Sequence, residues 1–301
     1  MANTTNHTSV GRLQYASERI PNRVFYIPFA YLYHVRLGTL PKLLAWAVIY
    51  IVPTAVYSAL LAHDLSIPLW QTMWTYLLLL VIVFTTYESG YIYNDTLLTR
   101  KETNPTIRLY DYNLEHFFNH YHIINITRAT ITILAWLGYI MAMPHFPAKH
   151  FLFIVIAYFA IPLLFTAYNR NRTIYNVFIY PLLVFSRYFV FLVPYFQSSL
   201  MTIATISLFV CFPLCNAIER FSMPRHRFPL IRTLIPTEQS KTLFRVGYYV
   251  ILLVILAPIL YSLYPVRIAS TLLSPIVLIT LMRLLILIVT RFHQPKNYLR
   301  G

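Results

Sequence analysis

The sequence predicts an all-helical bundle in a membrane, and three observations carry this prediction. Of the 301 residues, 58% are hydrophobic and only 11% are charged, whereas about a quarter of a soluble domain is charged. Eight stretches stay apolar over the roughly 20 residues that a membrane-crossing helix needs, and they do not alternate as barrel strands do. Basic residues gather in every second connection. This composition excludes an ordinary cytosolic enzyme, a disordered chain and a disulfide scaffold.

The predicted spans are flanked by segments that are polar or contain proline, and the outer connections between them are short. They run over 43–62, 73–93, 125–144, 150–168, 175–196, 200–217, 246–264 and 268–290. Nineteen of the 24 Lys and Arg residues lie in the termini and alternate connections, against two in the other connections and three within spans. Because Lys and Arg are enriched on the cytoplasmic side of a membrane, this count predicts that both termini are cytoplasmic.

The chain divides into an N-terminal segment, 1–42, and a single helical bundle, 43–301. The first 24 residues lack the apolar run of a signal peptide. Residues 24–38 are aromatic and weakly amphipathic, so we expect them to lie along the cytoplasmic interface. The compact size and the missing targeting segment favour a bacterial inner membrane. Cys211 and Cys215 are expected to be small core residues rather than a disulfide.

Two cytoplasmic connections of similar design follow the second and the sixth span. They read YESGYIYNDTLLTRKETNPTIRL, residues 87–109, and CNAIERFSMPRHRFPLIRTL, residues 215–234. Each begins with Asn and acidic residues at a helix end, continues into a basic segment, and contains Pro-x-Ile-Arg. The match predicts two parallel repeats of four helices, 43–168 and 175–290, because an even number of helices preserves orientation.

Acidic residues are rare, and four of the nine lie in or beside these connections. They are Glu88, Asp95, Glu102 and Glu219. An ionisable side chain inside an apolar span is costly, so Glu88 is expected to have a functional role or an arginine partner. Arg128 and Arg187 are the candidate partners. Glu88, Tyr91 and Asp95 share one face of a predicted helix.

Carboxylates beside Arg and Lys are typical of a site for a phosphorylated ligand. Carboxylate and amide oxygens suit Mg²⁺, which commonly bridges protein carboxylates and substrate phosphates. Arg and Lys can hold the remaining phosphate oxygens. The two connections therefore predict a diphosphate site at the cytoplasmic membrane surface. In the alternative interpretation, the basic residues only set the topology and attract anionic lipids.

These residues resemble the UbiA superfamily of intramembrane prenyltransferases, over roughly 36–290. After its second helix the family has the motif N-D-x-x-D-x-x-x-D. Asn94 and Asp95 match this motif, Leu98 replaces the second Asp, and Glu102 stands at the third.

The second connection is similar to the family's second Asp-rich motif. Asn216 and Glu219 stand at its first two acids, and Met223 replaces the last. The segments 36–58 and 168–183 also resemble the start of the family's first helix and the basic connection before its fifth helix. The family usually has nine spans, so a ninth helix is the alternative to eight.

The resemblance implies a helical bundle whose cavity is open to lipid, where Mg²⁺ binds a prenyl diphosphate. The metal and the cations would stabilise the departing diphosphate while an allylic cation develops and an acceptor attacks it. The implied metal ligands are Asn94, Asp95, Glu102, Asn216 and Glu219, with Asp95, Glu102 and Glu219 as the catalytic residues. The implied diphosphate ligands are Lys101, Arg108, Arg225, Arg227 and Arg232. The implied substrate-pocket residues are Glu88, Tyr91, Tyr168 and Tyr175, whose tyrosines could face a carbocation or pack as ordinary aromatics.

The departures from the family pattern leave three interpretations open. A single Mg²⁺ could be held by Asp95, Glu102 and Glu219, or the nearby cations could replace part of the metal charge, or catalysis could be lost while lipid binding remains. The expected function is transfer of an isoprenoid chain from a prenyl diphosphate to an acceptor. Non-catalytic isoprenoid binding and terpene cyclisation are the alternatives. The expected partners are a prenyl diphosphate or another isoprenoid lipid, together with membrane lipids, and not nucleic acid.

Two other functional classes fit the sequence less well. His116 and His120 are one helical turn apart, but a membrane di-iron oxygenase needs several histidine clusters on one side, and the other histidines are scattered. Residues 110–122 are better interpreted as an aromatic interfacial helix. A solute transporter would carry polar residues at mid-membrane in several helices, and few are present.

Overall fold

The computed structural model describes residues 20–99, 107–143, 148–170, 175–222, 228–235 and 238–292. Within these ranges the regular structure is helical and contains no strand. Seven stretches of these residues are helical, long and apolar enough to cross a membrane. They are Leu40–Asp64, Leu69–Leu98, Tyr121–Ala142, Phe151–Arg170, Met201–Phe221, Ser240–Leu263 and Val266–Val289. The prediction of an all-helical protein with apolar spans is therefore confirmed.

The predicted span over 175–196 differs from the other seven. Its helix, α7 (Asn176–Phe189), has 14 residues, which corresponds to about 21 Å against a bilayer core of about 30 Å. The chain then turns through residues 190–192 into the short 3-10 helix η6 (Val193–Tyr195). Pro194 explains the break, because proline has no N–H to donate and its ring clashes with the carbonyl four residues earlier.

The chain forms two compact units, and unit 1 consists of residues 1–43 and 80–137. Its elements are η1 (Asn22–Phe25), η2 (Leu32–Leu37), the later part of α3 (Leu69–Tyr93), η4 (Asn94–Leu98), α4 (Asp111–Asn119) and most of α5 (Tyr121–Ala142). Phe25, Phe117 and Ile124 belong to its buried apolar cluster. The N-terminal segment that we expected along the membrane interface therefore contributes buried side chains to the core of unit 1.

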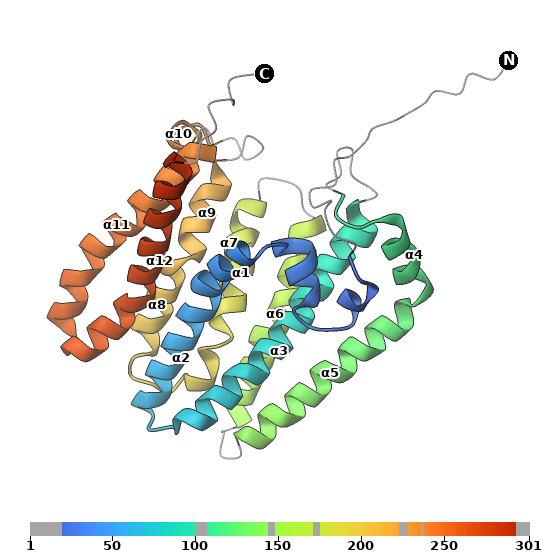
Figure 1. Ribbon diagram of the computed structural model, residues 1–301. Helices are drawn as coiled ribbons and strands as arrows, with labels where there is room; N and C mark the ends of the chain where they lie inside the picture. The colour runs from blue at the N-terminus through green and yellow to red at the C-terminus, as the bar shows by residue number, and fades with distance from the viewer. Residues whose placement is uncertain are drawn as a thin grey trace. The chain divides into compact units, whose positions relative to one another are not determined.

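Unit 2 consists of residues 44–79 and 138–301. Its elements are the end of α1 (Leu40–Trp46), η3 (Ala47–Ile51), α2 (Val52–Asp64), the start of α3, the end of α5, α6 (Ala148–Arg170), α7, η6, α8 (Met201–Cys211), α9 (Pro213–Phe221), α10 (Pro229–Leu234), α11 (Glu238–Leu263) and α12 (Val266–Phe292). Helices α11 and α12 form an antiparallel pair, and α6 packs along α7 (Figure 1). Cys211 and Cys215 are buried free thiols, as predicted.

Candidate functional site

Asp95 lies in the π-helical turn η4 that ends α3, and side chains of unit 1 enclose its carboxylate. Tyr31 Oη donates to Oδ2 at 2.8 Å, and Arg36 Nη2 lies 2.8 Å from both oxygens. Arg108 Nη1 and Asn94 Nδ2 each donate to Oδ1 at 3.2 Å. The side chain of Asp95 is 1% exposed, against 18% for Arg36 and 20% for Arg108. The carboxylate predicted to bind a metal thus accepts five contacts from protein donors.

Two aromatic side chains hold this cluster in place. Burial, together with the negative charge of Asp95, raises the pKa of Tyr31 well above its usual range. Tyr31 therefore remains a hydroxyl that donates to the carboxylate. The guanidinium of Arg36 lies over the ring of Tyr91, 4.2 Å from its centre. Tyr91, which we predicted to line a substrate pocket, thus orients an arginine.

Glu88 forms a second buried cluster in unit 1. Its carboxylate accepts the backbone N–H groups of Phe29 at 3.0 Å and Leu32 at 2.8 Å. Arg128 Nη2 donates to the same carboxylate at 3.1 Å, with 4% of the arginine side chain and 0% of the glutamate side chain exposed. Arg128 also donates to the carbonyl oxygens of Phe25 and Thr85 and to the hydroxyl of Ser89. Of the two predicted partners, Arg128 is therefore the one observed, and the burial favours a structural role for Glu88 over its predicted place in a substrate pocket.

Glu219 and Asn216 lie on α9 in unit 2, and each has a partner on another helix. Arg245 of α11 grips Glu219 with two hydrogen bonds, Nε to Oε2 at 2.8 Å and Nη2 to Oε1 at 2.6 Å. The fork-to-fork geometry of Arg245 and Glu219 is the strongest form of an arginine–carboxylate pair. Asn216 Nδ2 donates to the hydroxyl of Tyr180 on α7 at 2.9 Å. Glu219, like Asp95, is thus neutralised by arginine within its own unit.

Arg220 forms a platform with two tyrosines, which we call the Arg220 platform. Its guanidinium lies 4.6 Å from the ring centre of Tyr180 and 5.5 Å from that of Tyr168. The two rings are 5.5 Å apart and join α7 to the end of α6. Tyr168 was a predicted substrate-pocket residue, and Tyr180 and Arg220 complete the arrangement around it.

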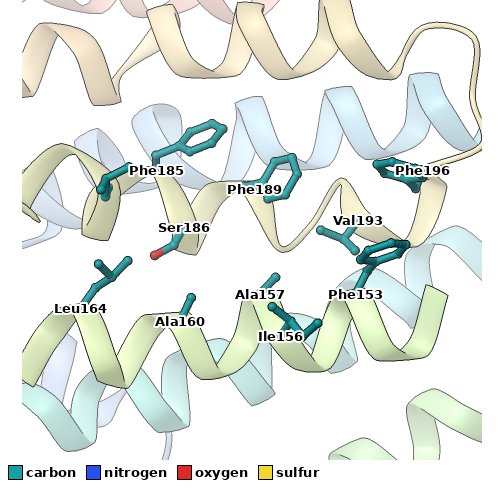
Figure 2. A pocket seen from close by; sticks show the side chains of 11 residues that line it. Phe153, Ile156, Ala157, Ala160, Leu164, Phe185, Ser186, Phe189, Val193 and Phe196 are labelled. Carbon is teal, nitrogen blue, oxygen red and sulfur yellow. The ribbon is translucent and has the colours of Figure 1, made fainter. Parts of the chain in front are cut away.

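An apolar cavity of about 330 Å³ lies between α6 and α7 (Figure 2). Leu164, Ala160 and Ala157 of α6 face Ser186 and Val193 across it in Figure 2. Apart from the Ser186 hydroxyl, the lining side chains are hydrocarbon: Phe153, Ile156, Ala157, Ala160, Leu164, Leu182, Phe185, Phe189, Val193 and Phe196.

None of the three side chains of the Arg220 platform lines this cavity. Tyr168 follows the lining residue Leu164 by one turn of α6, whereas Tyr180, two residues before Leu182, lies on the other face of α7. The apolar cavity is suited to a hydrocarbon chain, and the guanidinium of the Arg220 platform is suited to an anionic group. This site was not predicted as a whole, because small and aromatic residues at helical spacing also occur in ordinary packing.

The remaining predicted site residues are either exposed or outside the described residues. Lys101, Glu102, Arg225 and Arg227 fall outside the described residues. Arg232 is exposed on α10, and Tyr175 is 63% exposed just before α7. Among the described residues no group of three or more His, Cys, Asp or Glu side chains is placed to hold a metal. The predicted Mg²⁺ ligands belong to both units and include Glu102. That they converge on one ion therefore stays a prediction.

The histidines of α4 make contacts within unit 1. Tyr26 Oη lies 3.0 Å from His116 Nε2, and the rings of His116 and His120 stack with centres 4.2 Å apart. Burial, and the neighbouring His120, lower the pKa of His116 below its ordinary value. These contacts show that α4 packs on unit 1 through aromatic side chains, and its place at the membrane interface stays a prediction.

Acidification is expected to weaken the packing of α4. Because the pKa of His116 is lower in the folded state, the unfolded chain takes up a proton first, and stability is lost as the pH falls through the unfolded value of about 6.5. Thermal unfolding between pH 7.5 and 5.5 measures this slope. His116→Gln should flatten it slightly, whereas the exposed His122→Gln should not; equal slopes in both variants would refute the assignment.

Comparison of the chain with models of known protein families, with curated proteins and with solved structures finds no match. The resemblance to UbiA prenyltransferases therefore rests on the sequence of the two connections and of the segments 36–58 and 168–183.

Proposed function

We propose that the protein binds a prenyl diphosphate in unit 2 and transfers its isoprenoid chain to an acceptor, as the UbiA resemblance implies. The observations that carry the proposal are the apolar cavity between α6 and α7 and the Arg220 platform, whose Tyr168 follows the lining residue Leu164 by one turn of α6. Lipid tails are as apolar as the cavity wall, so burial of the chain by itself gives little preference over the surrounding membrane. Selectivity must then come from the shape of the cavity and from recognition of the head.

The Arg220 platform supports recognition of a diphosphate head. A guanidinium presents a planar fork that matches two phosphate oxygens, and the rings of Tyr168 and Tyr180 set the plane of this fork. With a diphosphate head on Arg220, the same rings would lie beside the leaving group, and an aromatic face attracts the charge of a developing allylic cation. One group of residues would then bind the head and stabilise the charge that forms as it departs.

Non-catalytic binding of the same lipid is a second candidate, and a specific observation favours it. Asp95 and Glu219 are both engaged by arginines. To bind Mg²⁺, each carboxylate would have to release its arginine. Membranes containing the protein, supplied with farnesyl diphosphate in Mg²⁺ or in EDTA, separate the candidates. Release of inorganic diphosphate with a prenylated product supports transfer, and retention of intact farnesyl diphosphate supports binding. The proposal is overturned if farnesyl diphosphate is neither converted nor retained.

Arg220→Met is expected to weaken farnesyl diphosphate binding by at least about tenfold, the scale of one lost charge-assisted contact. The reason is loss of the guanidinium while the tyrosine rings stay in place. Equilibrium binding to the detergent-purified protein measures the effect. Arg267→Met is the matched control, because it removes one exposed arginine of unit 2, at the start of α12. Equal affinities in the two variants would contradict the role of the Arg220 platform.

A further inference from the structure

We propose that Arg36 and Arg108 form a phosphate-binding site in unit 1 that works without a metal ion, and that Asp95 is its positioning residue. The chemical class of the ligand is a phosphate or diphosphate group. This is a second anion site, in unit 1, and its preference for phosphate does not depend on the prenyl diphosphate site proposed in unit 2. We call this cluster the arginine clamp.

The charge and exposure of the arginine clamp favour an anion over a cation. Two guanidinium groups surround a single carboxylate, so the three charges sum to +1. The Asp95 side chain is 1% exposed, while Arg36 and Arg108 remain 18% and 20% exposed. A ligand that approaches from outside therefore meets the edges of two arginines and not the carboxylate.

The hydrogen-bonding capacity of Asp95 leads to the same conclusion. A carboxylate offers about four acceptor positions, and Asp95 already receives contacts from Tyr31, Asn94, Arg36 and Arg108. An incoming Mg²⁺ would have to displace at least one arginine and meet the positive charge of the other. Asp95 is thus better suited to holding arginines than to holding a metal.

The two arginines keep donors for a ligand. Each guanidinium has five N–H donors, and the contacts with Asp95 use only Nη2 of Arg36 and Nη1 of Arg108. Nε of Arg36 is buried, so the donors that a ligand could reach are the Nη N–H groups that the contacts with Asp95 do not use. The ring of Tyr91 under Arg36 fixes the guanidinium plane. The donors are therefore positioned in advance, which lowers the entropic cost of binding.

Isothermal titration of inorganic diphosphate into the detergent-purified full-length protein, in EDTA, tests the arginine clamp. The wild-type protein is expected to bind in the absence of metal. Arg36→Met and Arg108→Met should each weaken binding by at least about tenfold. Arg23→Met, which removes an exposed arginine of the same unit, should change affinity less than about twofold. Arg36→Lys keeps the charge but loses the fork, and should fall between these results.

Asp95→Asn separates the arginine clamp from a metal site. The amide oxygen still accepts an arginine N–H, and the local charge rises from +1 to +2. We therefore expect folded Asp95→Asn to keep measurable diphosphate binding in EDTA, and to lose less affinity than Arg36→Met or Arg108→Met, because one oxygen remains to position the arginines. The thermal unfolding curve of each variant shows that it is folded. Loss of binding in folded Asp95→Asn, no binding by the wild-type protein in EDTA, or an equal effect of Arg23→Met would each overturn the proposal.

Farnesyl diphosphate distinguishes the source of the phosphate group. If the arginine clamp holds the head of a lipid, the Arg36 and Arg108 variants weaken binding of farnesyl diphosphate and of inorganic diphosphate together. If it holds a soluble anion, only the inorganic titration changes. Either result supports the phosphate site. The two proposals can fail independently. If Arg220→Met leaves farnesyl diphosphate binding unchanged while the Arg36 and Arg108 variants lose inorganic diphosphate binding, the proposed function fails and the arginine clamp stands.

Discussion

Glu88→Ala is expected to destabilise the protein by about 3–5 kcal/mol, because removal of one partner leaves the other as an uncompensated buried charge. The Glu88 and Arg128 side chains are 0% and 4% exposed, and they pair at 3.1 Å. Two backbone N–H groups, of Phe29 and Leu32, also lose their acceptor. Unfolding of the purified protein by a denaturing detergent or by heat measures the free-energy loss.

The matched control for this variant is Glu115→Ala, which removes an exposed carboxylate of the same unit. It should change the free energy of unfolding by less than about 0.5 kcal/mol. The double variant Glu88→Met with Arg128→Met should be less destabilised than the sum of the two single variants, because no charge is left without its partner. Additive effects, or equal effects of Glu88→Ala and Glu115→Ala, would show that the pair is not coupled.

Loss of Glu88 is also expected to release the N-terminal segment. Phe29 has a φ of 68°, a backbone conformation that is unfavourable for a bulky residue. The hydrogen bond from its N–H to Glu88 is one contact that keeps it there. Without that acceptor, residues 22–37 should become sensitive to limited proteolysis before the rest of unit 1. Mass spectrometry of the first cleavage products would locate the site.

The spans could be predicted from composition because hydropathy over about 20 residues depends on local sequence alone. Hydropathy does not reveal the break after Phe189, because the residues around Pro194 are as apolar as those of a membrane-spanning helix. Pairing of charges is a different problem. Arg36 and Asp95 are 59 residues apart and Arg245 and Glu219 are 26 apart, so the contacts depend on how helices pack. The sequence pointed to both acids, but Arg36 and Arg245 carried only the signal of cytoplasmic topology.

The two connections share more than their sequence pattern. In each, a carboxylate at a helix end is held by an arginine from another element, and a further contact places an arginine over a tyrosine ring. Asp95 with Arg36 over Tyr91 forms one example, and Glu219 lies next to Arg220 over Tyr180 in the other. Acids that a metal-dependent enzyme would use as ligands thus position cations here. The scarcity of acids and the net charge of +15 are consistent with anion recognition that relies on arginine.

The second large effect is expected in the cavity of unit 2. Ala160→Phe would place a phenyl ring between α6 and α7, where Ala160 and Leu164 now line the open space. We expect the affinity for farnesyl diphosphate to fall by at least about tenfold while the melting temperature is maintained, because the ring fills a void and leaves existing contacts in place. Leu163→Phe is the control on the same helix; this residue is 69% exposed and its replacement should have no effect on affinity.

The same variant tests whether the cavity holds the isoprenoid chain or only lies near it. A ring that shortens the cavity should exclude a long chain more than a short one, while the Arg220 platform still binds the head. Ala160→Phe should therefore bind dimethylallyl diphosphate within about twofold of wild type and farnesyl diphosphate much more weakly. An equal loss for both would indicate a displaced platform, and no loss for either would place the chain outside the cavity. Only a change in chain-length preference links the apolar lining of α6 and α7 to the substrate.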